Sequence, residues 1–283
     1  LIDESIKLKK ELKGKGNKSV LKNKTLTMIF QKPSTRTRVS FESGMYQLGG
    51  HAINLSSDDM QLSRGESIED TAKTLSRYTN CIMARVYDHE LLEKLSEHSS
   101  VPVINGLSDT FHPCQILADF MTIKEKKKKL KGLKITWIGD GNNVCNSMIY
   151  GAALSGVKIS IATPKGFEPN KTIVKDAKKL TTVELTTDPF VAVKNADVVV
   201  SDTFSSIHNL DKKRLKKFLP KYQVNSKLMS AAKKDAIFMH CLPAKRGEEV
   251  TSDVIDGVQS VVWDEAENRL HSQKALLSAL IHA

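Results

Sequence analysis

Residues 25–50 read TLTMIFQKPSTRTRVSFESGMYQLGG, and this stretch predicts the unit from which the whole fold is built. Its opening segment, TLTMIF, is rich in apolar and β-branched residues and predicts a short buried strand. From Ser34 to Leu48 apolar residues recur at helical spacing, and Gly49 and Gly50 then end the helix. A strand, a loop and a helix therefore follow one another here.

The same alternation continues along the chain and restarts after Gly132. Further strands are predicted by the apolar segments at residues 81–87, 101–107, 133–140, 158–163, 196–202, 236–242 and 260–265. Helices are predicted between them at residues 67–78, 89–99, 147–157 and 171–180, and an amphipathic helix is predicted at 272–283. Strands that alternate with helices form parallel sheets. We therefore predict an α/β fold of two Rossmann-like domains, each an open parallel sheet with helices on both faces.

The restart also predicts where the domains meet. A chain of 283 residues is long enough to bury two hydrophobic cores. We place the first domain at residues 1–120 together with a C-terminal helix at 266–283, and the second domain at residues 121–265.

The composition of the sequence indicates the cellular compartment in which we expect the protein. The sequence has neither a run of about 18 apolar residues nor a basic leader followed by an apolar core, so we expect no membrane span or secretory signal. Its four cysteines are scattered without a close pair, which argues against a zinc site or a disulfide framework. These features favour a soluble cytoplasmic protein.

The net charge of +11 is compatible with a nucleic-acid partner or with an anionic small substrate. The densest basic run, Lys126 to Lys129, has no interleaved aromatic residues and directly precedes a strand. Binding of single-stranded nucleic acid uses such aromatics for stacking. We therefore interpret the run as a solvated helix end and expect no nucleic-acid partner.

The loop after residue 30 concentrates hydrogen-bond donors. In KPSTRTR, Pro33 leads into the turn and Ser34 is a good N-cap, so the first backbone N–H groups of the helix are available to a ligand. Hydroxyl groups and the Arg36 guanidinium would converge with them, which suits a phosphate group. Taken alone, the stretch is equally compatible with an ordinary capped helix.

Two further motifs decide between these interpretations. STRTR at residues 34–38, HPCQ at 112–115 and HCLP at 240–243 occur in an order and at separations that resemble the aspartate/ornithine carbamoyltransferase family. The resemblance covers essentially the whole chain. It implies transfer of the carbamoyl group of carbamoyl phosphate to the δ-amine of L-ornithine, giving L-citrulline and phosphate, without metal or cofactor.

The resemblance also implies residue roles. Arg36, Arg85, His112 and Cys241 would be catalytic. Carbamoyl phosphate would be bound by a larger set, in which Gln61 reaches the site of a neighbouring subunit, so the resemblance implies a homotrimer or an assembly of trimers. That set comprises Ser34, Thr35, Arg36, Thr37, Gln61, Arg85, His112, Gln115, Cys241, Leu242 and Arg269.

The amine substrate is assigned to the second domain. The resemblance implies an ornithine site of Asn143, Asp202, Ser206, Ile207 and Cys241. Asn142 is an alternative to Asn143, because both amides follow the strand at 133–140. A dinucleotide site at GDGNNV is disfavoured, since the third glycine of that fingerprint is absent.

Other functions stay open at this point. Aspartate as the acceptor would need a cationic pocket, and the family then carries Pro-Leu-Pro-Arg where this chain has HCLP. Putrescine is a further possible acceptor, although Asp202 would then face no α-amino group. A non-catalytic anion-binding homologue is the third alternative, and it is favoured only by the departures from the family pattern at Ile207 and His208.

Overall fold

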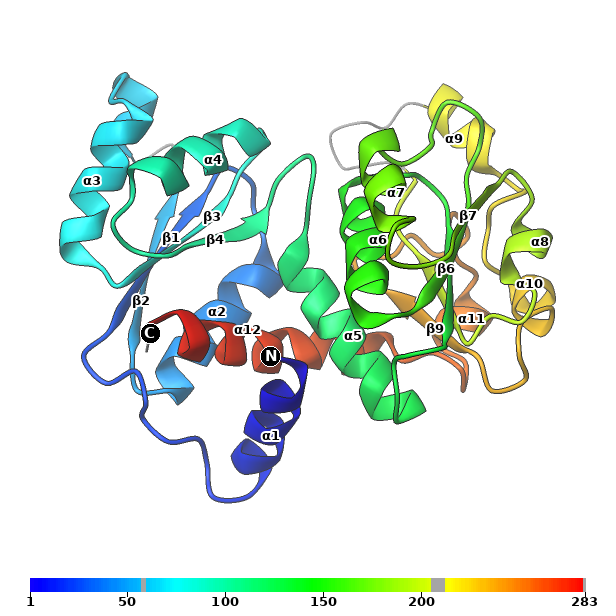
Figure 1. The fold of residues 1–283 in the computed structure, drawn as a ribbon, viewed down its shortest axis with the longest axis horizontal. Helices are drawn as coiled ribbons and strands as arrows, with labels where there is room; N and C mark the ends of the chain where they lie inside the picture. The colour runs from blue at the N-terminus through cyan, green and yellow to red at the C-terminus, as the bar shows by residue number, and fades with distance from the viewer. Residues whose placement is uncertain (57–59, 205–211, 282–283) are drawn as a thin grey trace. The chain divides into compact units, whose positions relative to one another are not determined.

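The computed structural model describes residues 1–56, 60–204 and 212–281. The chain divides into two compact units, Leu1–Met121 with Glu267–Ala283, and Thr122–Ala266 (Figure 1). Each unit holds one open sheet in which every strand pair is parallel. The predicted α/β fold is therefore confirmed.

The sheet of the first unit has the strand order β2-β1-β3-β4. Its strands are β1 (Thr25–Phe30), β2 (His51–Ser56), β3 (Cys81–Arg85) and β4 (Val103–Leu107). The helices of this unit are α1 (Ile2–Lys13), α2 (Thr35–Gln47), α3 (Ile68–Tyr78) and α4 (His89–His98), together with the 3-10 helix η2 (Gln61–Arg64). Two longer helices, α5 (Pro113–Lys127) and α12 (Val262–Ile281), run along the chain from one unit into the other.

Alternation along the strands gives this sheet two apolar faces. Met28 of β1 packs in a cluster with Phe41 of α2 and Leu277 of α12. Its neighbour Ile29 belongs to a second cluster, with Leu92 of α4. Figure 1 shows the same division, with α2 and α12 on one face of the sheet and α3 and α4 on the other. Covering both faces is what a parallel sheet requires.

The sheet of the second unit has the strand order β7-β6-β5-β8-β9. Its strands are β5 (Lys134–Ile138), β6 (Lys158–Ala162), β7 (Val183–Thr186), β8 (Val198–Ser201) and β9 (Ile237–His240). Its helices are α6 (Asn143–Ser155), α7 (Lys171–Ala177), α8 (Pro189–Val193), α9 (Lys212–Phe218), α10 (Ser226–Ser230) and α11 (Ser252–Ile255). One core cluster joins β5, β8 and β9 to helices α8 to α11 and includes the stacked rings of Phe204 and Phe218.

One predicted strand is wrong. Residues 260–265 are not a strand: Ser260 makes a single bridge to Phe238, and α12 begins at Val262. Asp264 and Glu265 lie in the first turn of α12, where acidic side chains complement the helix dipole. Strands β2 and β7 are present although no pattern predicted them, because both are partly exposed and lack a continuous apolar run.

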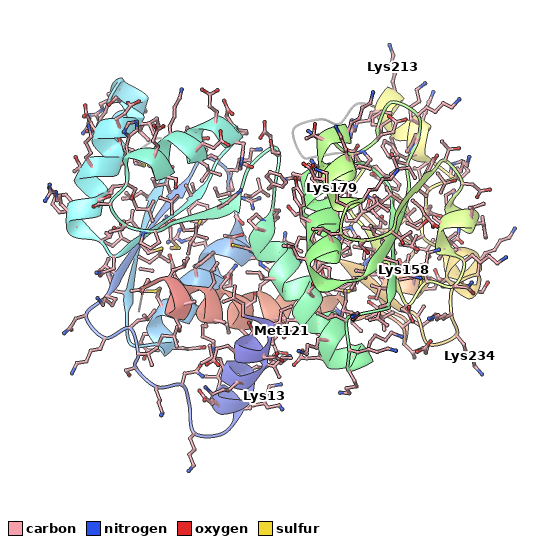
Figure 2. The ribbon with its side chains drawn as sticks, viewed as in Figure 1. Lys13, Met121, Lys158, Lys179, Lys213 and Lys234 are labelled. Carbon is pink, nitrogen blue, oxygen red and sulfur yellow. The ribbon has the colours of Figure 1, made fainter. Side chains whose placement is uncertain are left out.

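The basic residues lie mostly at the surface. Figure 2 shows Lys213 and Lys234 projecting outward from the second unit, and both side chains are exposed. Lys126 and Lys127 lie in the last turn of α5 and pair with Asp264 and Asp235, so this run is a helix end. Within the described residues, none of the helices has the length and apolar character needed to span a membrane.

Candidate functional site

The start of α2 presents positive charge at the end of β1. Ser34 caps the helix, and its hydroxyl accepts a hydrogen bond from the backbone N–H of Thr37 at 3.4 Å. Thr35 and Arg36 are exposed at the first turn. Arg38 is paired with Glu42, whereas Arg36 has no carboxylate partner within the described chain. The exposed guanidinium and the helix N-terminus together suit an anionic ligand.

Arg85 lies beside this helix start because β3 pairs with β1. The register aligns Phe30 with Arg85, and the backbone N–H of Gln31 donates to the Arg85 carbonyl at 2.9 Å. Lys32 lies close by, with its ammonium 4.1 Å from the centre of the Tyr87 ring. Burial and then the positive charge of Arg85 lower the pKa of Lys32. Lys32 was not among the predicted site residues, although it stands next to Pro33 in the KPSTRTR motif.

His112 is buried at the start of α5, where its carbonyl accepts from the backbone N–H of Gln115. Burial lowers the pKa of His112 well below its ordinary value, and the charges of Arg269, Arg85 and Arg36 lower it further. The imidazole is therefore neutral at physiological pH. A neutral imidazole can donate one hydrogen bond to a carbonyl oxygen without giving up its proton.

A buried polar network anchors this region. Arg269 of α12 donates to the Gln115 side-chain oxygen at 2.7 Å and to the Thr37 hydroxyl at 3.2 Å. The Gln115 amide nitrogen donates to Asp119 at 2.8 Å. In the amide orientation that satisfies its neighbours, Gln273 also accepts from Arg269. The structure therefore brings together three segments that carry predicted residues of the first unit: the start of α2, α5 and α12.

Gln61 stands apart from this network. It is the first residue of η2 and is exposed, and its side chain makes no hydrogen bond within the described residues. The role of Gln61 in a neighbouring subunit stays a prediction.

In the second unit, Asp202 is the centre of the polar groups at the carboxyl ends of the strands. It is nearly buried after β8. Its carboxylate accepts from the Asn142 amide at 2.7 Å, from the backbone N–H of Thr203 at 2.7 Å and from the Cys241 thiol at 3.2 Å. The structure thus brings Asp202 and Cys241 together, as a site that could bind a cationic amine.

The two neighbouring amides have different roles. Asn142 caps α6 by accepting from the backbone N–H groups of Val144 and Cys145, so both ends of its amide are engaged. Asn143 is half-buried at the first position of α6, and its side-chain oxygen accepts from the N–H of Val144. Asn142 thus orients Asp202, a role that the sequence did not reveal.

Asp140 is held by a residue that sequence reasoning missed. Arg214 of α9 pairs with the Asp140 carboxylate, and its Nε donates to the carbonyl of Phe204 at 2.9 Å. Burial raises the pKa of Asp140, and Arg214 opposes that effect. The predicted residues Ser206 and Ile207 lie outside the described residues, as does His208.

Asp202, His240 and Cys241 offer three ligand atoms within 4.8 Å of one another, a spacing compatible with a metal ion. Both ring nitrogens of His240, however, already have hydrogen-bond partners: the N–H of Leu242 at 2.9 Å and Glu249 at 3.1 Å. The residues therefore do not form a ready metal site.

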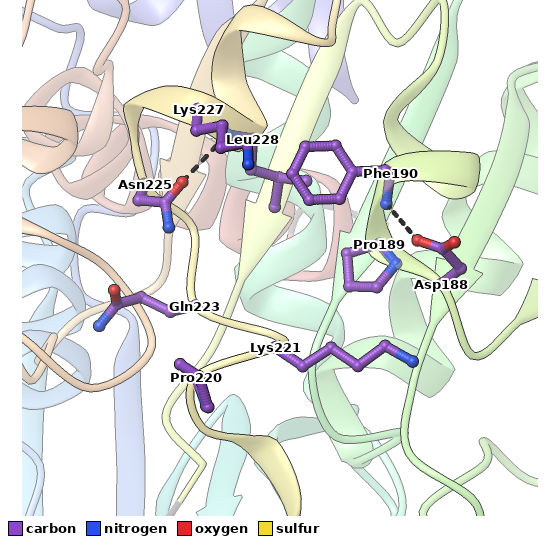
Figure 3. A pocket seen from close by; sticks show the side chains of 9 residues that line it. All are labelled: Asp188, Pro189, Phe190, Pro220, Lys221, Gln223, Asn225, Lys227 and Leu228. Atoms are coloured by element: carbon purple, nitrogen blue, oxygen red, sulfur yellow. Dashed lines mark hydrogen bonds between the residues drawn. The ribbon is translucent and has the colours of Figure 1, made fainter.

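Two pockets lie away from these groups. One, of about 260 Å³, belongs to the second unit (Figure 3). The other, of about 510 Å³, belongs to the first. No predicted site residue lines either pocket. The polar groups at the carboxyl ends of the strands are better candidates for the functional site than these two pockets. They combine charge, burial and convergent hydrogen bonds.

The class of protein is indicated by the cationic groups around His112 in the first unit and by the polar groups around Asp202 in the second. The first unit suits a phosphate-bearing substrate with a carbonyl, and the second suits an amine, so the chain has the features of a two-domain α/β group transferase. Profile comparison makes the family explicit. Residues 1–125 match the carbamoyl-P binding domain of aspartate/ornithine carbamoyltransferase, and residues 131–280 match its Asp/Orn binding domain. The chain belongs to the aspartate/ornithine carbamoyltransferase family.

Individual relatives are consistent with this family assignment. A protein of Cenarchaeum symbiosum named ornithine carbamoyltransferase is 63% identical over 280 residues, which are 99% of this chain and 92% of the relative. A Pyrococcus furiosus protein named anabolic ornithine carbamoyltransferase is 53% identical, over 93% of this chain and 85% of the relative. The solved structure of ornithine carbamoyltransferase from Pyrococcus furiosus has a TM-score of 0.96 at 51% identity and covers 100% of this chain and 92% of that one.

Proposed function

We propose that the chain transfers the carbamoyl group of carbamoyl phosphate to the δ-amine of L-ornithine, giving L-citrulline and phosphate. The observation that carries the chemistry is the neutral His112 held among Arg36, Arg85 and Arg269. The identity of 63% to a relative named ornithine carbamoyltransferase supports ornithine as the acceptor.

In this proposal the phosphate is bound by Ser34, Thr35, Arg36 and Thr37 at the start of α2. Arg85 and His112 donate to the carbamoyl oxygen, which gains negative charge as the amine attacks. Removing one such donor costs roughly 3–4 kcal/mol of transition-state stabilisation in other enzymes. Gln115 and Arg269 support the carbamoyl group, and their buried network supports this role.

The amine must lose a proton before it attacks. An alkyl ammonium group has a pKa near that of lysine, about 10.4, so the site has to favour the neutral form. We assign binding of ornithine to Asn143, Asp202, Ser206, Ile207 and Cys241, with Asp202 next to the α-amino group and Cys241 next to the δ-amine. The neutral nitrogen then bonds to the carbamoyl carbon, the bond from that carbon to the phosphate oxygen breaks, and the departing phosphate takes up the proton that the nitrogen loses as citrulline forms.

We further propose that the protein is cytoplasmic and works as a homotrimer or an assembly of trimers. Gln61 and Leu242 complete the carbamoyl phosphate site in this scheme, with Gln61 supplied by a neighbouring subunit. Exposure of Gln61 in the single chain supports this assignment. Size-exclusion chromatography with light scattering tests the oligomer.

A citrulline assay tests the function. The purified chain is incubated with carbamoyl phosphate and with ornithine, putrescine or aspartate, alone and in competition. The proposal predicts citrulline from ornithine and little product from the other two amines. Preferred carbamoylation of putrescine or aspartate would reassign the substrate, and no turnover with any amine would support a non-catalytic anion-binding protein.

A further inference from the structure

His240, the last residue of β9, is fully buried beside the candidate amine site. Its Nδ1 lies 2.9 Å from the backbone nitrogen of Leu242, and its Nε2 lies 3.1 Å from Glu249 Oε1. A backbone N–H can only donate, so Nδ1 must be the acceptor. The ring proton is therefore on Nε2 and is donated to Glu249. The neighbours of His240 select one neutral tautomer.

Glu249 is buried at considerable energetic cost. Its side chain has no exposed surface, and its Oε2 has no hydrogen-bond partner within the described residues. Its Oε1 accepts from His240 and also from the backbone N–H of Lys245 at 2.6 Å. An apolar side chain of similar size would avoid the cost of burying a carboxylate. What the carboxylate supplies is an acceptor for the His240 Nε2 proton.

The turn that follows His240 needs this support. Leu242 has φ of 58°, in the left-handed region that is unfavourable for a leucine. Its N–H is bonded to His240, and Cys241 lies between them with its thiol 3.2 Å from Asp202. The backbone N–H of His240 is itself held by Glu265 at 2.9 Å. The direction of the Cys241 side chain therefore depends on a turn whose geometry is set by buried groups.

We propose that Glu249 and His240 are positioning residues: Glu249 selects the His240 tautomer, the tautomer binds the Leu242 N–H, and the resulting turn holds the Cys241 thiol against Asp202. The proposal rests on the proposed function only where it concerns ornithine. Neither residue touches substrate in this scheme. The same tautomer leaves no ring nitrogen of His240 available to a metal ion.

Two substitutions of Glu249 separate its acceptor role from its volume. Glu249→Gln keeps an oxygen that can accept from His240 and Lys245, whereas Glu249→Met fills similar space without an acceptor. In Glu249→Met we expect a release of the thiol, with alkylation of Cys241 by iodoacetamide several-fold faster, and a KM for ornithine about 10-fold to 100-fold higher. Glu249→Gln should restore both quantities to within about threefold of the wild type.

Alkylation is followed by mass spectrometry on the intact folded chain, because Cys81, Cys114 and Cys145 are buried and Cys241 is half-buried. The KM for carbamoyl phosphate should change far less than the KM for ornithine. Glu248→Gln is the matched control, because Glu248 precedes Glu249, is partly exposed and pairs through its side chain with Lys245. Equal values for Glu249→Met and the wild type, or equal values for Glu249→Met and Glu249→Gln, would overturn the proposal.

A measurement on the unaltered protein covers the case in which Glu249→Met does not fold. In chain labelled with ¹⁵N-histidine, His240 should show an unprotonated Nδ1 and a protonated Nε2. A charged ring, or a proton on Nδ1, would contradict the tautomer. The ¹⁵N spectrum and the alkylation rate need no substrate, so they decide the proposal even if the citrulline assay fails.

Discussion

The two units hold their charged groups at the carboxyl ends of parallel strands in different ways. In the first unit the residues that we assign to the phosphate come from one short motif at the start of α2, which also carries Lys32, and Arg85 lies at the end of the neighbouring strand β3. In the second unit the central group is one carboxylate, Asp202, and its partners Asn142 and Cys241 are distant in sequence. A local segment thus supplies the residues assigned to the phosphate, whereas the partners of Asp202 are brought to it by the fold.

Arg85→Met tests the cationic side of this comparison and should have the largest effect. Loss of a charged donor to the carbamoyl oxygen should lower kcat by about 10²-fold to 10³-fold, because that oxygen carries charge in the transition state. Steady-state kinetics with ornithine measure it. Arg77→Met, an exposed arginine of α3 in the same unit, is the control and should keep normal activity. Similar kcat values for the two variants would remove Arg85 from the mechanism.

Asp202→Asn tests the anionic side. Replacing the carboxylate by an amide should raise the KM for ornithine about 10-fold to 100-fold, since hydrogen bonds to a charged group are lost. The KM for carbamoyl phosphate should change little. Asp188→Asn makes the same chemical change in the same unit at the N-cap of α8, where asparagine is an equally good cap. An unchanged KM for ornithine in Asp202→Asn would argue against an amine site at this carboxylate.

The first unit also buries one positively charged side chain, Lys274, in its core, and this burial disfavours the charged form of the lysine. Lys274 is fully buried on α12 and donates to the amide oxygens of Asn17 and Gln47. Burial lowers its pKa from 10.5 to about 8. The unfolded state therefore binds more protons between these two values, and stability should rise with pH across that range.

The contribution of Lys274 to the free energy of unfolding should rise by about 2 kcal/mol between about pH 7.5 and pH 9.5. Urea unfolding at both pH values measures it, and Lys274→Met should lack that part of the rise. Lys7→Met, at an exposed lysine paired with Glu4, serves as the control. A rise of equal size in Lys274→Met and the wild type would show that Lys274 is not its source.

The smallest expected effect is that of His112 on the pH dependence of activity, because its imidazole is already neutral at physiological pH. Its pKa lies well below the ordinary value, so kcat/KM should show no titration of His112 between about pH 6 and pH 8. His112→Gln, which keeps a donor but cannot titrate in this range, should have a lower rate with the same profile. A midpoint near pH 6.5 in the wild type that disappears in His112→Gln would mean that the surrounding arginines do not suppress protonation.

The comparison between the units also explains what the sequence could predict. The β1 strand and the helix start at Ser34 were predictable from strand–loop–helix periodicity, whereas the grouping of HPCQ with STRTR was implied by the family resemblance. Strand β7 was missed because only one of its four residues is buried, whereas the equally short β8 and β9 are mostly buried. Residues 260–265 were predicted as a strand because their apolar run continues into a helix.

The supporting groups of the second unit could not be predicted in the same way. Asn142 and Asp202 are 60 residues apart, and Arg214 and Asp140 are 74 residues apart. Nothing in the local sequence of either residue specifies its partner, since a buried polar group is satisfied by whatever the fold brings within reach. Motifs identify the residues that we assign to the ligands, and the structure is needed to find those that hold them in place.

The most direct test of the central claim is phosphate binding by two variants of the same helix start. Isothermal titration calorimetry compares Arg36→Met with Arg38→Met, whose native arginine is paired with Glu42. If the start of α2 captures the phosphate group, Arg36→Met should weaken binding of inorganic phosphate by about 10-fold or more, whereas Arg38→Met should bind it like the wild type. Equal affinity in Arg36→Met and the wild type would contradict the account.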